Sequence, residues 1–531
     1  QATDFDGDTV TLNGKLTISI RDDIPQLIGN VSVGGVVEEE QLQGGNDDFR
    51  PNPIDADQRM AGPEDYNQTT NIVSGTGANS LSALVAVGAD ENGKFEVRSD
   101  IGNVVIKDQA GHTVTSEGHN VVVSGVSEGS DNGGRFDMIT AKAGGNVVFT
   151  LKIYENGNWT FELKNQLDHA FGDNREGTLA LDLSRLVKFT DFDGDSVNLS
   201  GGSFKVTVID DVPIANLSPG YDADLRLDET KAGSPQDTWA DPDANDEQGV
   251  ANPFSAYGQL IGYAEGGRGD LFGESVSVGA DAPGSKAYSL ELSFAPGASS
   301  GLQDSQTNAN ILLKQVNGDV VGYFMDGGTE RVSFVIRTDA NDGDVRVYQY
   351  RAIEHNDPRD ADENGGLFGS QPEALNNGLV YLKLTVTDRD GDQAVDRIDI
   401  GRAVRFEDDG PAVLSGSSDR LIDEKDIQTT WSDGTANGSG PAFIQGSLAN
   451  YVNFGSDGAA SGGGFSIAAD RVGAELASLG LRSQGTELSY SVSQSGGFDV
   501  LIASANDHAV FELKLNKSSG AYEFRLFDQI D

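Results

Sequence analysis

The chain has 531 residues, no Cys and a formal net charge of −47 at pH 7, from 84 acidic and 37 basic side chains. The absence of Cys excludes disulfide scaffolds, Cys-ligated zinc, thiol nucleophiles and iron–sulfur clusters. A surface with this much negative charge repels phosphate groups, so nucleic acid is not an expected partner. No run of 18 apolar residues occurs, so membrane insertion is not expected either. The length predicts about three to four domains. The 68 Gly predict many turns and few long helices.

An acidic motif, Asp-x-Asp-Gly-Asp, occurs three times along the chain, at residues 4–8, 191–195 and 388–392. Each copy is followed by alternating apolar residues and then by Asp-Asp-x-Pro, at residues 22–25, 210–213 and 408–411. An apolar residue followed by two acidic residues comes next in each repeat, and the second acidic residue is Glu39, Glu229 or Glu424. The repeat of roughly 190 residues is far longer than a solenoid period, so it predicts a tandem array of whole domains.

These repeats divide the chain into four parts. Residues 1–24 are predicted to be the last hairpin of a preceding module, and residues 25–212 a complete module. Residues 213–410 are a divergent module, and residues 411–531 the front of a further module whose remainder lies beyond the sequence.

Alternating apolar residues predict half-buried strands in every module. They occur in residues 10–20, 147–153, 204–208, 382–386, 511–515 and 522–526. Short strands with frequent Gly, Asn and Asp turns predict an all-β chain of tandem antiparallel β-sandwich domains of immunoglobulin-like type, in an extended array. Residues 179–188 fit a short helix or a strand equally well.

Three polar stretches at matching places, residues 40–72, 229–256 and 425–441, are predicted to be surface loops. Trp239 and Trp431 lie in two of them. An aromatic in an acidic loop can be a ligand platform, but the recurrence favours a Trp that packs its loop onto the sandwich.

The carboxylates are predicted to meet at one end of each module. Asn13-Gly14 is a strong hairpin turn, and pairing Leu12 with Lys15 puts Asp4 opposite Asp23. The same construction at Gly201-Gly202 puts Asp193 opposite Asp210. We expect the Glu of the following module to complete the site, which would place a cation between consecutive modules.

Several carboxylates at one spot repel one another unless a cation binds, and an all-oxygen donor set suits Ca²⁺. The alternative is a solvated Asp-Gly turn beside an acidic linker. An EF-hand is excluded because position twelve of the loop, counted with Asp191 as position one, is Gly202 where an EF-hand has Glu. The predicted Ca²⁺ ligands are Asp4, Asp6, Asp8, Asp22, Asp23, Glu39, Asp191, Asp193, Asp195, Asp210, Asp211, Glu229, Asp388, Asp390, Asp392, Asp408, Asp409 and Glu424.

The set of motifs in residues 3–25 and 190–213, with the Gln-Leu-Asp-His of residues 166–169, resembles the repeat modules of giant RTX adhesins and related type I secreted surface proteins. The middle module is similar to a sister module class, through Ile353-Glu-His355 and the Phe406-Glu-Asp-Asp-Gly-Pro411 segment. The resemblance implies type I secretion, a location at the bacterial cell surface, and Ca²⁺-stiffened modules that support cell adhesion or biofilm formation. The nonapeptide repeats of that family are absent.

The same residues leave other functions open. The divergent middle module is an alternative binding site for a peptide or glycan on a target cell. An enzyme such as a polysaccharide hydrolase has no positive motif, so no catalytic residue is predicted. His169 and His355 occupy equivalent positions and favour a structural hydrogen bond. Arg268-Gly-Asp270 is an integrin-type tripeptide, but such triplets arise readily by chance in a Gly- and Asp-rich chain.

Overall fold

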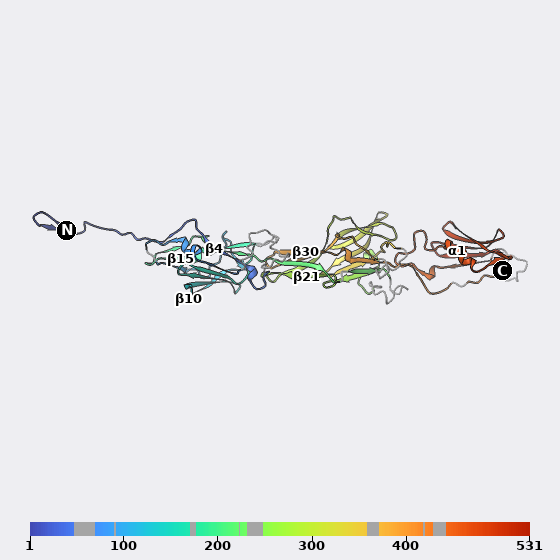
Figure 1. Ribbon diagram of the computed structural model, residues 1–531, viewed down its shortest axis with the longest axis horizontal. Coiled ribbons are helices and arrows are strands. Elements are labelled where there is room, and N and C mark those ends of the chain that lie inside the picture. Colours follow the sequence, from blue (N-terminus) through green and yellow to red (C-terminus); the bar gives the residue numbers. More distant parts are fainter. Residues whose placement is uncertain are drawn as a thin grey trace. The chain divides into compact units, whose positions relative to one another are not determined.

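The computed structural model describes residues 1–46, 70–89, 92–169, 177–221, 224–230, 248–357, 371–417, 420–427 and 442–531 (Figure 1). The described chain divides into two compact units. Unit 1 comprises residues 1–216, 275–286 and 385–396, and unit 2 comprises residues 217–274, 287–384 and 397–531. The predicted boundary near residue 212 therefore lies close to the end of the first long segment of unit 1. Two short segments of the predicted middle module also belong to unit 1.

Unit 1 is built from β-sheets around one apolar core. The largest sheet has the order β10-β11-β12-β13-β5, and two three-stranded sheets have the orders β14-β17-β4 and β16-β15-β7. The strand bounds are β4 Val33–Glu38, β5 Ile72–Gly75, β7 Lys94–Val97, β10 Val122–Asp131, β11 Gly134–Ala143, β12 Asn146–Tyr154, β13 Trp159–Leu163, β14 Thr178–Asp182, β15 Val187–Thr190, β16 Ser196–Asn198 and β17 Phe204–Ile209. Short two-stranded ribbons are β3 (Gln26–Leu27) with β6 (Val85–Ala86) and β8 (Thr115–Ser116) with β9 (His119–Asn120).

The alternation predicted for residues 147–153 and 204–208 is confirmed, because Phe149, Leu151, Phe204 and Val206 are buried in the core of unit 1. Trp159 lies among them, and its indole N–H donates to Asn79 O over 2.9 Å. The undecided stretch 179–188 is strand β14, the 3₁₀ turn Ser184–Leu186 and the start of β15.

Unit 2 contains most of the predicted middle module and the front of the next. The middle module has a six-stranded sheet, β20-β27-β26-β25-β24-β23, and the sheets β19-β31-β28, β22-β29-β30 and β18-β21. Their bounds are β18 Ile214–Pro219, β19 Leu225–Asp228, β20 Gly262–Gly266, β21 Phe272–Ser277, β22 Ser285–Leu292, β23 Ala298–Gln303, β24 Asn310–Val316, β25 Asp319–Asp326, β26 Thr329–Thr338, β27 Val345–Gln349, β28 Glu373–Ala374, β29 Val380–Thr387, β30 Gln393–Asp399 and β31 Val404–Glu407.

The last part of unit 2 has a five-stranded sheet, β33-β40-β39-β38-β37, with the short pairs β32-β34 and β35-β36. The bounds are β32 Ala412–Val413, β33 Ala442–Ser447, β34 Val452–Asn453, β35 Arg482–Ser483, β36 Thr486–Glu487, β37 Ser489–Ser495, β38 Phe498–Ala505, β39 His508–Asn516 and β40 Ala521–Leu526. Helix α1 (Ala469–Ala477) packs on β37 through partly buried apolar residues such as Val472. The all-β prediction is thus confirmed, and the described residues contain one α-helix.

The expectation of purely antiparallel sheets is wrong in two places. Strand β4 pairs in parallel with β17, and β19 pairs in parallel with β31. Each parallel pair joins a strand near the start of a module to one at its end, so a long connection separates the two strands, as parallel pairing requires.

The first 24 residues do not form the predicted hairpin. Strands β1 (Ala2–Thr3) and β2 (Thr9–Val10) pair across the first acidic loop, and Lys15 N–H donates to Leu12 O in the predicted turn, but residues 16–24 form no strand. Leu16, Ile18 and Ile20 are exposed because no described strand covers their apolar face. Trp239 and Trp431 lie outside the described residues, with most of the three polar loops. No helix among the described residues is long and apolar enough to cross a membrane.

Candidate metal centre

All three Asp-x-Asp-Gly-Asp segments form the same tight turn. In each, the first Asp N–H donates to the last Asp O, over 3.0, 2.9 and 3.1 Å in the copies that begin at Asp4, Asp191 and Asp388. The first Asp also accepts the Gly N–H through its side chain. The Gly has a φ of 103° to 111°, which an L side chain rarely adopts, so Gly is required there.

The predicted register of the second hairpin is wrong. A turn does form at Gly201-Gly202, but the strands on either side of it diverge, since β16 pairs with β15 and β17 pairs with β14 and β4. The acidic segment 191–195 is itself the hairpin turn, between β15 and β16. Asp193 therefore groups with Asp191 and Asp195, whereas Asp210 groups with Asp390 and Asp392 of the next repeat.

Parallel pairing explains how Glu39 and Asp210 meet. Glu38 and Ile209 are register partners at the ends of β4 and β17, so the next residue of each strand leaves the sheet at the same end. Both side chains are buried, with residue exposures of 0% for Glu39 and 1% for Asp210. The expectation that Glu39 completes a site with Asp22 and Asp23 is thus contradicted, because Glu39 lies with the acidic pair at the end of its own module.

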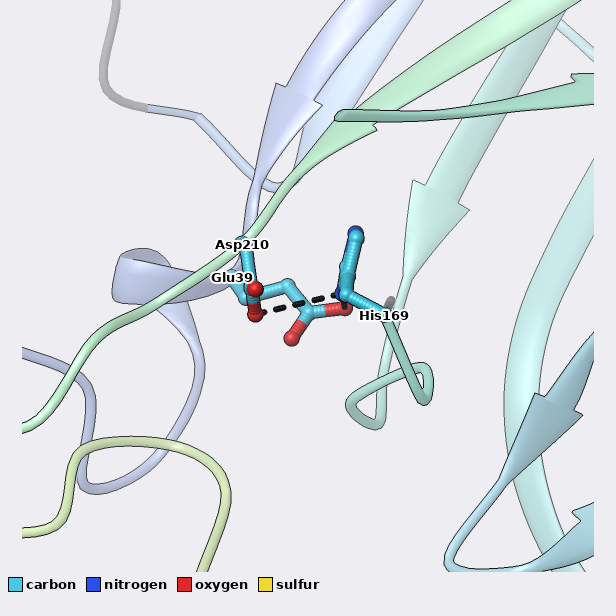
Figure 2. A group of neighbouring side chains, drawn as sticks. All are labelled: Glu39, His169 and Asp210. Atoms are coloured by element: carbon cyan, nitrogen blue, oxygen red, sulfur yellow. Dashed lines mark ion pairs between the residues drawn. The ribbon is translucent and has the colours of Figure 1, made fainter. Parts of the chain in front are cut away.

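His169 faces both of these carboxylates from the other side of the site (Figure 2). Its Nδ1 is 3.2 Å from Asp210 Oδ1 and 3.9 Å from Glu39 Oε1, and its side chain is 1% exposed. Leu167 N–H donates to Glu39 Oε1 over 2.8 Å, which ties the segment before His169 to the same site. Burial disfavours the charged imidazolium, but the hydrogen bond and charge of Asp210, the hydrogen bond with Val208 O and the charge of Asp390 together outweigh it, so the pKa of His169 is raised.

Two acidic loops of the next repeat, both within unit 1, complete the group. One loop, between β21 and β22, carries Asp281, and the other is the turn of residues 388–392 between β29 and β30. Arg389 N–H donates to Asp281 O over 3.0 Å, and His169 N–H donates to Asp390 Oδ2 over 3.1 Å. We call the whole set the unit 1 carboxylate cluster: Glu39, His169, Asp210, Asp211, Asp281, Asp388, Asp390 and Asp392.

These carboxylates are too close and too buried to ionise together. Burial, then repulsion by Asp210 and Asp390, raises the pKa of Asp281 to about 9. Burial and the contact with Asp390 raise the pKa of Asp388 to about 8. The pKa of Glu39 lies well above its usual value because of burial and the charges of Asp281 and Asp210. Without a cation, the cluster must hold protons at neutral pH.

Several buried oxygens of the cluster accept no hydrogen bond from the described residues: both carboxylate oxygens of Asp281, Oε2 of Glu39 and Oδ2 of Asp210. Buried polar atoms are normally paired, so these oxygens fit a cation that would bind them. A donor set of six or more carboxylate oxygens from four chain segments suits a hard divalent ion such as Ca²⁺, with the imidazole at its edge.

Unit 2 holds a second group of the same kind. Strands β19 and β31 pair in parallel with Asp228 opposite Glu407, which brings the following residues, Glu229 and Asp408, together. Glu229 is fully buried, and burial and the charge of Asp457 hold its pKa well above its usual value. Burial raises the pKa of Asp408 to about 7. The charge of His355 lowers this pKa, whereas the charge of Asp457 raises it. Glu229 is therefore placed with Asp408, not with Asp210 and Asp211 as expected.

A cavity of about 860 Å³ opens beside this second group and is lined in part by His355, Asp408 and Asp457. The contact between Leu167 N–H and Glu39 in unit 1 has two counterparts in unit 2. In the first, Ile353 N–H donates to Glu229 Oε1 over 2.9 Å. Glu424 makes the same contact with Ile530 N–H, over 2.8 Å, instead of joining Asp408 and Asp409.

A further repeated motif escaped the sequence analysis. It reads Val-Gly-Ala-Asp at residues 87–90 and 278–281 and Phe-Gly-Ser-Asp at residues 454–457. Its Asp supplies Asp281 and Asp457, while Asp90 lies outside the described residues. The signal was present as a self-similar tetrapeptide, but a single Asp after Gly-Ala is too common to notice without the structure.

The same motif explains the second Asp of each acidic pair. Asp23, Asp211 and Asp409 accept the backbone N–H that follows the motif's Gly, from Ala89 over 2.9 Å, Ala280 over 2.6 Å and Ser456 over 2.9 Å. These three Asp residues thus hold the next repeat by its backbone. Asp22 and Asp23 remain exposed, as do Asp4, Asp6 and Asp8, which form a group of their own among the described residues.

Comparison with known proteins adds one match. Residues 224–401 match a family model described as a domain of unknown function (DUF5801). No curated protein matches the chain. The match falls on the divergent middle module and supplies no activity for it.

Proposed function

We propose that this chain is a segment of a secreted RTX-type bacterial adhesin, a Ca²⁺-rigidified repeat region that supports cell adhesion or biofilm formation at the cell surface after type I export. It acts as a structural and binding protein, not as an enzyme. Its partners are the neighbouring repeats of the same chain. The resemblance of the repeats to adhesin modules supports the proposed family. The unit 1 carboxylate cluster supports the proposed role of Ca²⁺.

The cluster supports this proposal because its ligands come from two consecutive repeats. Glu39, Asp210 and Asp211 belong to one repeat, and Asp281 with the acidic turn 388–392 belongs to the next. A cation that neutralises them would stabilise the contact between the repeats only while it is bound. Sites of this type are expected to have dissociation constants of roughly 10⁻⁴ to 10⁻³ M, so that they fill outside the cell and empty in the cytosol.

The test is calorimetric melting of the full chain in Ca²⁺ and in excess chelator, for the wild type and for Asp281→Asn. Asp281 has two buried oxygens without hydrogen bonds, so the amide should fold while losing a ligand. We expect Ca²⁺ to raise the melting temperature of the wild type strongly. In Asp281→Asn, the apparent Ca²⁺ affinity should fall about tenfold or more.

The matched control is Asp507→Asn, which removes the same charge from an exposed hairpin turn of unit 2. Its response to Ca²⁺ should equal that of the wild type. If Ca²⁺ stabilises neither the wild type nor the control, the acidic turns are solvated loops and the metal part of the proposal fails.

The alternative, a peptide- or glycan-binding middle module, has one observation in its favour. Aromatic rings gather on one face of its six-stranded sheet, with Phe254 packed against Tyr257 and Tyr348. Tyr257 is 42% exposed, so part of that group reaches solvent. A glycan array and a peptide array, both probed with the full chain in Ca²⁺, test this alternative. Binding that Tyr257→Ala abolishes would support it, and no hit at high protein concentration would exclude it.

A further inference from the structure

The tripeptide Arg268-Gly269-Asp270 lies at the tip of a tight turn between β20 and β21 of unit 2. All three residues are exposed, and the Arg268 side chain is 63% exposed. Gly269 has a φ of 103°, so the turn needs Gly between the two charged residues.

Backbone hydrogen bonds and two buried side chains fix the conformation of the turn. Gly269 N–H donates to Phe272 O over 2.7 Å, and Leu271 N–H donates to Gly267 O over 2.9 Å. The side chains of Leu271 and Phe272 are 2% and 0% exposed, so the residues directly after Asp270 are fixed in the core. Because the backbone next to Arg268 and Asp270 is already fixed, the turn loses little conformational entropy when it binds a partner, which favours affinity.

A second segment supports the same tip from the side. Gly220 N–H donates to Leu271 O over 3.0 Å, and Tyr221 N–H donates to Gly269 O over 3.3 Å. The Tyr221 side chain itself is 98% exposed and lies in the chain next to this contact. The surface beside the tripeptide therefore offers an exposed aromatic ring, a residue type enriched at binding interfaces.

We propose that Arg268-Gly269-Asp270 is an adhesive site for an integrin-type receptor. In such a complex the Asp270 carboxylate would bind a divalent cation held by the receptor, and the Arg268 guanidinium would pair with receptor carboxylates. This site is separate from the carboxylate clusters and does not depend on the proposed role of Ca²⁺ in joining repeats.

One interaction must change on binding. The Arg268 guanidinium is paired with Glu274 Oε1 over 3.0 Å, and Glu274 also accepts a hydrogen bond from the Tyr288 hydroxyl. Arg268 would have to leave this carboxylate for that of the receptor. Replacing Glu274 with Gln should release Arg268 and strengthen receptor binding.

The experiment measures binding of the full chain to an immobilised integrin ectodomain that recognises Arg-Gly-Asp peptides, in Ca²⁺ and Mn²⁺. We expect saturable binding that a cyclic Arg-Gly-Asp peptide competes away. Asp270→Glu, which keeps the charge but moves the carboxylate by one methylene, should lower affinity at least tenfold. Glu274→Gln should raise it severalfold.

The matched control is Asp326→Glu, which makes the same change in another exposed hairpin turn of the middle module. It should bind like the wild type, and circular dichroism melting should show that all variants are folded. Equal binding by wild type and Asp270→Glu, or binding that the cyclic peptide does not compete, would overturn the proposal. Neither result would bear on Ca²⁺-dependent melting.

Discussion

Single residues in this chain are fixed by close backbone approach as much as by charge. Gly279 shows this most clearly, because a Cβ at this position would lie 2.4 Å from Asp211 Oδ2 and its φ is 70°. The glycine therefore lets Asp211 reach the backbone N–H of Ala280. A side chain here would push the second Asp of the acidic pair away from the next repeat.

We expect Gly279→Ala to weaken Ca²⁺ binding by roughly tenfold and to destabilise the unit by about 1–3 kcal/mol, since it combines positive-φ strain with loss of a buried hydrogen bond. Isothermal titration with Ca²⁺ and chemical denaturation measure the two effects. Gly202→Ala is the control, because Gly202 has a φ of 79° but nothing within 4 Å of a new Cβ. A Ca²⁺ affinity reduced equally in both variants would mean that strain alone is responsible.

At the scale of elements, the parallel pair β4–β17 is the feature that aligns the metal ligands. Its packing leaves no space at Gly34, where a Cβ would lie 1.9 Å from Lys205 O. Any side chain at Gly34 must separate the two strands or shift their register. Because Glu39 and Asp210 follow these strands, such a shift would also move the carboxylates.

Gly34→Ala is therefore expected to cost about 1–3 kcal/mol of unfolding free energy and to reduce the Ca²⁺-dependent rise in melting temperature. Differential scanning calorimetry with and without Ca²⁺ gives both quantities. Gly29→Ala provides the comparison, since a Cβ there meets nothing within 4 Å. Wild-type behaviour of Gly34→Ala would show that β4 and β17 do not set the geometry of the cluster.

The sequence pattern predicts where the strands lie more accurately than it predicts which strands pair. Alternation identified the strands around Phe149, Phe204 and Leu382 because each buries one face, which period two reports directly. It could not identify β4 as the neighbour of β17, since their register partners Val33 and Phe204 are 171 positions apart in the chain and meet only in the folded state. The prediction instead followed the local rule that sequential strands form hairpins. As a result, it assigned Glu39, Glu229 and Glu424 to the wrong sites.

At the scale of the whole molecule, pH should act on stability through the raised carboxyl pKa values. Asp211, Asp388 and Asp281 have folded pKa values of about 6, 8 and 9, against 3.8 in the unfolded chain. A carboxyl group whose pKa is higher in the folded state than in the unfolded state stabilises the fold at low pH. This contribution is lost as the pH rises from the unfolded pKa to the folded pKa, because the unfolded chain releases its proton first. The raised pKa of His169 acts in the same direction.

In excess chelator, the melting temperature of unit 1 should fall, by on the order of 10 °C, as the pH rises from about 5 to about 9. With saturating Ca²⁺ the fall should disappear, because the ion favours the ionised carboxylates and competes with protons. Calorimetry at matched ionic strength measures both series. A flat profile in chelator would mean that the cluster keeps its charges without metal.

The division of each site between two repeats has a consequence for how such a chain can change in length. The repeats of residues 25–212 and 213–410 each carry a Glu, a His segment and an acidic pair for one contact, and a Gly-Ala-Asp with an acidic turn for the other. Any set of the first kind therefore fits any set of the second. Genes that encode these arrays could lose or duplicate a whole repeat by recombination, and the product would still contain only matched contacts.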